Sequence, residues 1–152
     1  MDAHLCGGCL CGAIRFECQG APISAVFCHC RNCQKAHAAP FAAVALMPPG
    51  SIALLAGAPK RHEMIAESGA SIFREFCGHC GTHLFSGGAR FPEFKAVKIA
   101  ALDEPAAISP VAHVWTENLI KWACIDDGLP AFSKQPEMVE IEQLWANREG
   151  AG

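Results

Sequence analysis

The chain has 152 residues, a formal net charge of −3 and a sequence pI of about 6.1. Its Lys and Arg residues form no basic run, which disfavours the clustered basic face that proteins use to bind nucleic-acid phosphates. No segment approaches the length of an apolar membrane span, and no basic region followed by an apolar stretch opens the sequence, so neither membrane insertion nor secretion is expected.

Cysteine, glycine and proline are the informative residue types. A chain of this length is expected to form one domain over residues 1–152, because it can bury about 68–70% of its unfolded surface. The fourteen glycines and ten prolines favour short strands and turns over long helices. Because a cytoplasmic protein is expected, the ten cysteines indicate metal binding rather than disulfides.

Short strands separated by turns are predicted along most of the chain. Alternating apolar residues predict a half-buried strand at 14–18, and an apolar run ended by prolines predicts a buried strand at 41–47. Further strands are predicted at 25–27, 52–56, 61–66, 82–86, 94–101 and 111–115. Residues 34–38 can form a short helix, and apolar residues at three- and four-residue spacing predict an amphipathic helix at 137–148.

Two cysteine motifs lie far apart in the sequence. The first, Cys6-Gly7-Gly8-Cys9-Leu10-Cys11, contains two competing pairs, because Cys6 and Cys9 are two residues apart and Cys9 and Cys11 only one. Spacing alone leaves both pairs open. The second motif, Cys77-Gly78-His79-Cys80, is a strong zinc knuckle, since its glycines let backbone amides turn toward the thiolates.

A third motif places Cys28, Cys30 and Cys33 within six residues. Cys28 and Cys30 are separated by one residue and cannot form an unstrained disulfide, whereas three thiolates can converge on one Zn²⁺ at about 2.3 Å. Three protein ligands leave one tetrahedral position for water or substrate, as in catalytic zinc sites. The alternative is that His37, four residues after Cys33, closes the site. We therefore expect one closed and one open zinc site, that is, two zinc ions per chain.

Three blocks resemble the signatures of the glutathione-dependent formaldehyde-activating enzyme family. They are residues 8–12, 28–35 and 74–82, and the segments 113–122 and 127–132 resemble its C-terminal pattern, so the resemblance covers about residues 7–133. The resemblance implies a structural zinc and a catalytic zinc, whose ligands are Cys9, Cys11, Cys77 and Cys80 for the first and Cys28, Cys30 and Cys33 for the second. It also implies a mostly β fold of several small, coiled antiparallel sheets, a β-tent, to which zinc knuckles and one C-terminal helix are added.

The expected function is that of a zinc-dependent carbon–sulfur lyase that acts on glutathione and a small aldehyde. A thiol that enters the open zinc position must lose its proton to bind well, and its attack on an aldehyde carbonyl gives a hemithioacetal. Arg31, Lys35 and Arg74 are candidates to bind the two carboxylates of glutathione, and ordinary solvated surface charges are the alternative.

Two other functions remain open at this stage. The chain could be a non-catalytic zinc module for a protein partner, or a hydrolase in which zinc activates water; the second ranks lower because thiolate-rich zinc is a weak Lewis acid. His29 is expected to point away from the metal, and His113 to be buried and hydrogen-bonded. Cys18 and Cys124 are expected to be small buried apolar residues, Trp122 to lie in the core or a pocket wall, and Cys6 has no partner motif.

Overall fold

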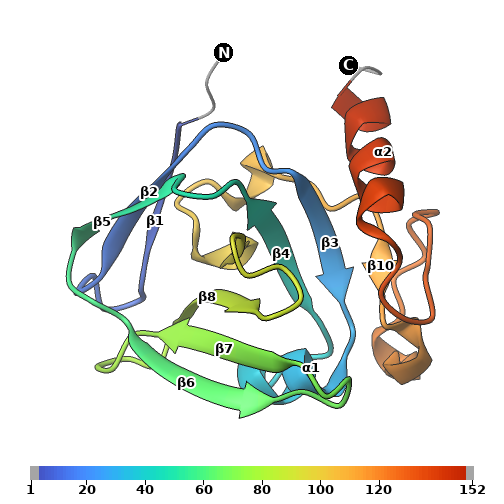
Figure 1. Cartoon of the computed structure of the whole chain (residues 1–152), viewed down its shortest axis with the longest axis horizontal. Helices are drawn as coiled ribbons and strands as arrows, with labels where there is room; N and C mark the ends of the chain where they lie inside the picture. Colours follow the sequence, from blue (N-terminus) through green and yellow to red (C-terminus); the bar gives the residue numbers. More distant parts are fainter. Residues whose placement is uncertain (1–3, 150–152) are drawn as a thin grey trace. The chain divides into compact units, whose positions relative to one another are not determined.

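The computed structural model describes residues 4–149 and shows a mostly β chain with sheets of three and seven strands (Figure 1). The strands are β1 (His4–Gly8), β2 (Arg15–Gln19), β3 (Ser24–Cys28), β4 (Ala42–Met47), β5 (Ile52–Ala56), β6 (Lys60–Ile65), β7 (Ser71–Phe76), β8 (His83–Gly88), β9 (Lys95–Lys98) and β10 (His113–Val114). The helices are α1 (Arg31–His37) and α2 (Met138–Glu149). The prediction of a mostly β fold with one C-terminal helix is confirmed.

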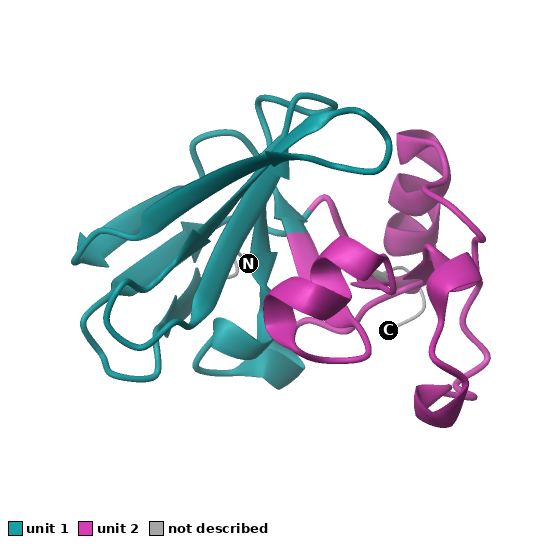
Figure 2. Ribbon diagram, turned by 90° about the horizontal axis from the view of Figure 1, so that it is seen from below, with its two compact units in different colours: residues 1–22, 46–107 teal, residues 23–45, 108–152 magenta. Residues whose placement is uncertain are grey.

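Two compact units divide the chain (Figure 2). The first comprises Met1–Pro22 and Leu46–Ala107, and the second comprises Ile23–Ala45 and Ile108–Gly152. Each unit contains one of the cysteine clusters described below. None of the helices in the described part of the chain has the length and apolar character that a bilayer crossing requires.

In the first unit, β1, β2 and β5 form an antiparallel sheet, and β6, β7, β8 and β9 pair in chain order as antiparallel neighbours. The alternation predicted at 14–18 is confirmed, because Phe16 and Cys18 are buried while their neighbours in β2 are partly or fully exposed. The ring of Phe16 meets that of Phe85 edge-on, with centroids 4.9 Å apart. This aromatic pair anchors the core between the two sheets of the unit.

In the second unit, β3 pairs with β10 in parallel, so that Phe27 lies opposite His113. Helix α2 buries Ile141 in a cluster with Ala112 and Val114, as the spacing of its apolar residues predicts. Its last turn is tied down by Arg148, which donates hydrogen bonds to the carbonyls of Ser109 and Pro110. The helix predicted at 137–148 is therefore confirmed to within one residue.

Other boundaries differ from the predictions. The strand expected at 94–101 ends at Lys98, and Ile99–Ala101 continues as a 3₁₀ helix. The strand expected at 111–115 is reduced to β10, because Trp115 has a φ of 59° and cannot continue an extended chain. Trp122, expected in the core or a pocket wall, lies in a 3₁₀ turn and is 80% exposed. Isolated 3₁₀ turns have no apolar periodicity from which to predict burial.

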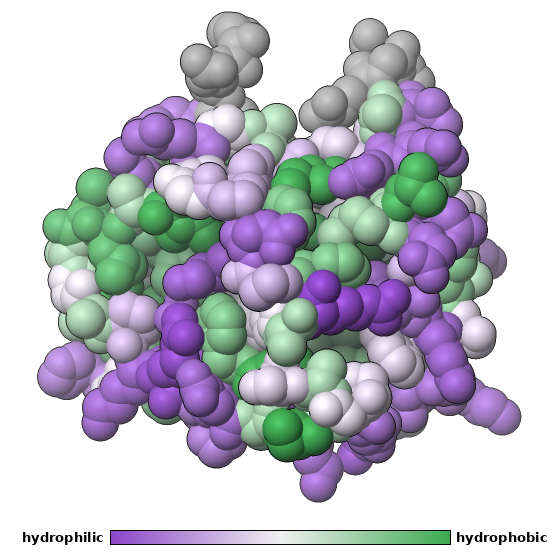
Figure 3. All heavy atoms as spheres, in the orientation of Figure 1, coloured by the Kyte–Doolittle hydropathy of each residue, from purple (hydrophilic) through white to green (hydrophobic). Residues whose placement is uncertain are grey.

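The wholly apolar strand β5 is exposed. Leu54 and Leu55 are 47% and 57% exposed, and β5 ends the order of the three-stranded sheet. Figure 3 shows apolar side chains gathered over this part of the first unit. An apolar sequence predicted this strand, but its place at a sheet edge decides that its side chains meet solvent.

A buried carboxylate holds two cations in the sheet of the first unit. Glu75 in β7 accepts hydrogen bonds from Arg61 at 2.6 Å and Lys95 at 2.9 Å. Burial alone would raise the pKa of Glu75, but Lys95 and Arg61 outweigh it and lower the pKa. Arg61 also covers the ring of Phe73, with its guanidinium carbon 3.9 Å from the centroid. The ion pairs thus join β6, β7 and β9.

Glu75→Gln should lower the free energy of unfolding by about 2–3 kcal/mol at pH 7. Breaking a fully buried ion pair costs ~3–5 kcal/mol, and we expect less here because Arg61 and Lys95 both reach solvent. Because folding lowers the pKa of Glu75, its carboxylate stabilises the fold at pH values above its ordinary pKa of 4.5. This stabilisation is lost as the pH falls through the pKa of the folded state. The free energies of unfolding of the native chain and Glu75→Gln, measured with urea, should therefore differ less at pH 3 than at pH 7.

The matched control for this change is Glu63→Gln, because Glu63 is 70% exposed and reaches Arg61 only at 3.9 Å. We expect it to change stability by no more than about 0.5 kcal/mol. A pH-independent difference between Glu75→Gln and the native chain would show that the ion pairs contribute nothing and that only packing has changed.

Candidate metal centres

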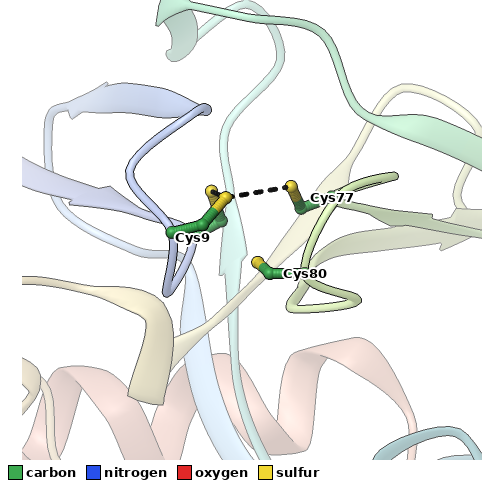
Figure 4. Close-up of side chains that lie close together, drawn as sticks. Cys9, Cys77 and Cys80 are labelled. Carbon is green, nitrogen blue, oxygen red and sulfur yellow. Dashed lines mark hydrogen bonds between the residues drawn. The ribbon is translucent and has the colours of Figure 1, made fainter.

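Four thiols of the first unit meet between two turns. Cys9 and Cys11 lie in the turn that follows β1, and Cys77 and Cys80 lie in the turn between β7 and β8. Figure 4 shows Cys9 facing Cys77 and Cys80 across the gap between these turns. The Sγ atoms of Cys9 and Cys11 are 3.6 Å apart, those of Cys11 and Cys77 are 3.8 Å apart, and all four lie within 4.8 Å of one another.

This spacing fits a tetrahedral zinc ion. Zinc–sulfur bonds of about 2.3 Å place the sulfurs of a tetrahedral site about 3.8 Å apart, whereas a disulfide needs about 2.05 Å. All four thiols are free of disulfides. The structure therefore brings together the set that the family resemblance implied, and it leaves Cys6 outside both clusters.

Backbone and hydroxyl groups point at the sulfurs of this cluster. The N–H of Ile14 donates to Cys9 at 3.2 Å. The N–H of Leu10 donates to the Thr82 hydroxyl at 3.1 Å, which leaves the hydroxyl hydrogen for Cys80, 3.2 Å away. Donors aimed at sulfur favour the thiolate form. This chain of hydrogen bonds also ties the two cysteine-bearing turns together.

The thiols have unequal acidities. The Thr82 hydroxyl and N–H, with the N–H of Cys11, lower the pKa of Cys80 to about 5. The N–H of Ala13 acts in the same sense on Cys11, but the neighbouring Cys9 and burial prevail and raise its pKa to about 11. Four thiolates this close repel one another. A divalent cation would relieve the repulsion, so the donor set fits a metal ion.

The second cluster forms where β3 passes into α1. Cys28 ends β3, Cys30 is the N-cap of α1, and Cys33 lies in its first turn, where its N–H donates to the sulfur of Cys30 at 3.3 Å. The three Sγ atoms lie within 4.8 Å of one another. The thiol of Cys28 donates to the sulfurs of Cys30 and Cys33, which favours its protonated form and, together with burial, raises the pKa of Cys28 well above its ordinary value. A cation here would take the place of thiol protons.

His37 does not join this cluster. Among residues 4–149, the group of His, Cys, Asp and Glu donors that surrounds this point consists of the three thiols alone. His37 lies in the last turn of α1. Of the two arrangements left open by the sequence, the geometry therefore favours three protein donors over four.

Gln34 holds the segment that carries the second cluster in place. Its buried amide donates to the carbonyls of His29 and Asn118, both at 2.9 Å, and its oxygen accepts from Arg31 at 2.5 Å. One side chain thus satisfies two backbone acceptors, one 5 residues before it and the other 84 residues after it. The sequence analysis did not identify this role, because a glutamine beside a cysteine motif carries no local signal for it.

Sequence reasoning also missed a buried chain of polar groups beside the second cluster. Nε2 of His29 lies 2.9 Å from Nδ1 of His113, and Nε2 of His113 lies 3.0 Å from the Asp127 carboxylate. The Asp127 carboxylate accepts the Nε2–H of His113. Nδ1 of His113 is then the acceptor nitrogen of this imidazole and accepts the Nε2–H of His29. The prediction that His113 is buried and hydrogen-bonded is confirmed. The N–H of Leu129 and His113 lower the pKa of Asp127.

The remaining candidates fall in different environments. Arg31 and Lys35 are exposed and four residues apart on α1, whereas Arg74 is buried in β7 of the first unit. Cys18 is fully buried, as expected. Cys124 is exposed, so its expected burial is wrong; it follows a 3₁₀ turn that packs no apolar face inward.

Comparison with known proteins gives one family and two relatives. The family model described as glutathione-dependent formaldehyde-activating enzyme matches residues 4–118. A Fusarium vanettenii protein named "Putative glutathione-dependent formaldehyde-activating enzyme" is 26% identical over 95 residues, which are 57% of this chain and 50% of that protein. The chain thus spans about half the length of this curated relative. A crystal structure of a Rhodobacter sphaeroides protein shares the fold, with a TM-score of 0.55, 19% identity and coverage of 84% of this chain and 98% of that one.

Proposed function

Because the chain belongs to the glutathione-dependent formaldehyde-activating enzyme family, we propose that it is a zinc-dependent carbon–sulfur lyase. Its substrates would be glutathione and a small aldehyde, and it would form and cleave the adduct between them. The observation that carries this proposal is the cluster of Cys28, Cys30 and Cys33, in which three thiols converge without a fourth His, Cys, Asp or Glu among residues 4–149.

The reaction joins a thiol and an aldehyde without loss of atoms. A carbon–sulfur bond forms between the thiol sulfur and the carbonyl carbon, and the thiol proton ends on the former carbonyl oxygen. The reverse reaction breaks the same bond. Zinc held by the three thiols would supply the chemistry of this step by stabilising the substrate sulfur as a thiolate at neutral pH.

The chain's own residues would keep the three donors aimed at one point. Cys30 starts α1 and accepts the N–H of Cys33, while Gln34 fastens the backbone at His29. The side chain of His29 is engaged by His113 and is 1% exposed, so it leaves the space beside the sulfurs to the three thiols. A donor set held before the substrate arrives needs little reorganisation during the reaction.

Exposed cations of α1 are the proposed contacts for the carboxylates of glutathione. Arg31 and Lys35 are four residues apart and thus lie on one face of the helix. Arg74, a candidate because it precedes Cys77 closely in the sequence, is buried in β7, so the proposal rests on the two cations of α1. Substitution of Arg31 and Lys35 should therefore raise the KM for glutathione more than it lowers kcat.

A cobalt-substituted protein tests whether a thiol reaches the second cluster. We expect glutathione to change the sulfur-to-cobalt absorption bands, because its thiolate would add a fourth sulfur to three protein donors. S-methylglutathione, which has the same carboxylates and no thiol, should leave these bands unchanged. The metal content of the untreated protein should be two ions per chain, one for each cluster.

The variant Cys30→Ser assigns the response to the second cluster. It should keep the cobalt of the four-thiol cluster and lose the change caused by glutathione. A native protein with two metal ions and no response to any thiol would contradict the proposed enzyme function and would favour a zinc-binding module without catalysis.

A further inference from the structure

Cys6, which spacing alone could not separate from the first zinc motif, has partners of its own. It lies in β1 opposite Glu17 of β2, and its carbonyl accepts the N–H of Asp103 at 2.9 Å. Its backbone is therefore held from both sides. The period of two along β1 turns Leu5 into the core and leaves Cys6 and His4 on the other, accessible face.

On this face a histidine connects the thiol to a carboxylate. Nε2 of His4 lies 2.8 Å from Oε2 of Glu17, and Nδ1 of His4 lies 3.7 Å from Sγ of Cys6. A carboxylate only accepts hydrogen bonds, so Glu17 takes the Nε2–H and leaves Nδ1 with a free lone pair directed at the thiol. The order thiol, imidazole, carboxylate is the arrangement in which a base activates a nucleophile and a third group orients the base.

We propose that Cys6 is a reactive thiol, activated by His4 and Glu17, that exchanges with small disulfides. This inference does not depend on the proposed lyase function. Cys6 is absent from both groups of residues that can hold a metal, so the site is separate from the candidate zinc centres. It is also partly exposed, and the side chain of His4 is 58% exposed, so a small molecule has access to the pair.

The exchange balances without an outside oxidant. The Cys6 S–H gives its proton to Nδ1 of His4 while the sulfur attacks one sulfur of the disulfide. The disulfide bond breaks, a new one forms with Cys6, and the departing thiolate takes the proton from His4. One disulfide is consumed, one mixed disulfide is formed, and one small thiol is released. Glu17 stabilises the imidazolium that exists between the two proton transfers.

The test measures where and how fast a small disulfide modifies the zinc-loaded full chain. The probe is bis(2-hydroxyethyl) disulfide, which is uncharged, and peptide mass spectrometry quantifies the modification of each cysteine over time. Cys124, an exposed thiol outside both clusters, is the internal reference in every sample. In His4→Gln, the rate of modification at Cys6 relative to Cys124 should fall about tenfold or more. Loss of a general base typically costs about 10²–10⁴-fold, so tenfold is the smallest decrease that we expect.

Two further variants make the result specific. Glu17→Gln keeps a hydrogen-bond acceptor for His4 but removes its charge, so the relative rate should lie between those of the native chain and His4→Gln. His62→Gln, which changes an exposed histidine of β6, should leave the rate unchanged. Equal relative rates in the native chain and His4→Gln, with zinc content and circular dichroism unchanged, would overturn the proposal, as would a native Cys6 that is not modified.

Discussion

Cys77→Ser should release one zinc ion per chain and unfold the first unit at 25 °C. Cys77 is fully buried, and its sulfur lies 3.8 Å from that of Cys11, on the opposite turn of the cluster. A serine hydroxyl is neutral and cannot replace a thiolate ligand. Structural zinc contributes an apparent ~10–16 kcal/mol in zinc-folded peptides, whereas an entire domain is stable by only about 5–15 kcal/mol.

The loss is measurable as zinc content together with the thermal unfolding transition. Cys18→Ser is the matched control, because Cys18 is a fully buried thiol of the same unit that belongs to neither cluster. It should keep both zinc ions and lose only about 1–3 kcal/mol, the cost of a buried hydroxyl without a partner. If Cys77→Ser behaves like Cys18→Ser, the four thiols do not hold a structural metal.

Cys30→Ser should abolish thiol–aldehyde exchange while the fold is retained. The exchange between glutathione and a small panel of aldehydes is measured by NMR in the native chain and the variant. The expected loss is on the order of a hundredfold or more, because even changes behind the ligands of a metal site cost about 10–100-fold. The fold is retained because serine is among the preferred N-cap residues and can accept the N–H of Cys33 in place of the sulfur.

Zinc content and circular dichroism verify that only the second cluster has changed. Cys124→Ser removes an exposed thiol of the same unit and should exchange at the native rate. Native exchange in Cys30→Ser would remove the catalytic assignment of the three thiols. Exchange by the native chain with one aldehyde of the panel would identify the substrate class.

Local spacing was sufficient to predict the turns that carry the clustered cysteines. The second cluster lies within six residues, so a few backbone dihedrals at the junction of β3 and α1 determine where its sulfurs point. The strands at 14–18 and 52–56 and the helix at 137–148 followed from periodicity for the same reason, because each depends on neighbours in the sequence.

Contacts between distant segments could not be predicted from local spacing or periodicity. His29 and His113 are 84 residues apart, and they meet because β10 pairs in parallel with β3 in the register that places Phe27 beside His113. Spacing likewise left open whether Cys6 or Cys11 pairs with Cys9. In the structure, Cys6 stays within β1 while Cys9 follows the end of that strand and turns toward Cys77.

The sequence by itself therefore determined the kind of chemistry: two groups of thiols, their local turns and a fold of short strands. Tertiary structure alone decided which histidines connect and which apolar residues remain exposed, and it brought the thiols of two distant turns together. The physical reason is that a turn is set by the dihedrals of a few residues, whereas the approach of Cys11 to Cys77, 66 residues away, depends on the pairing of whole strands.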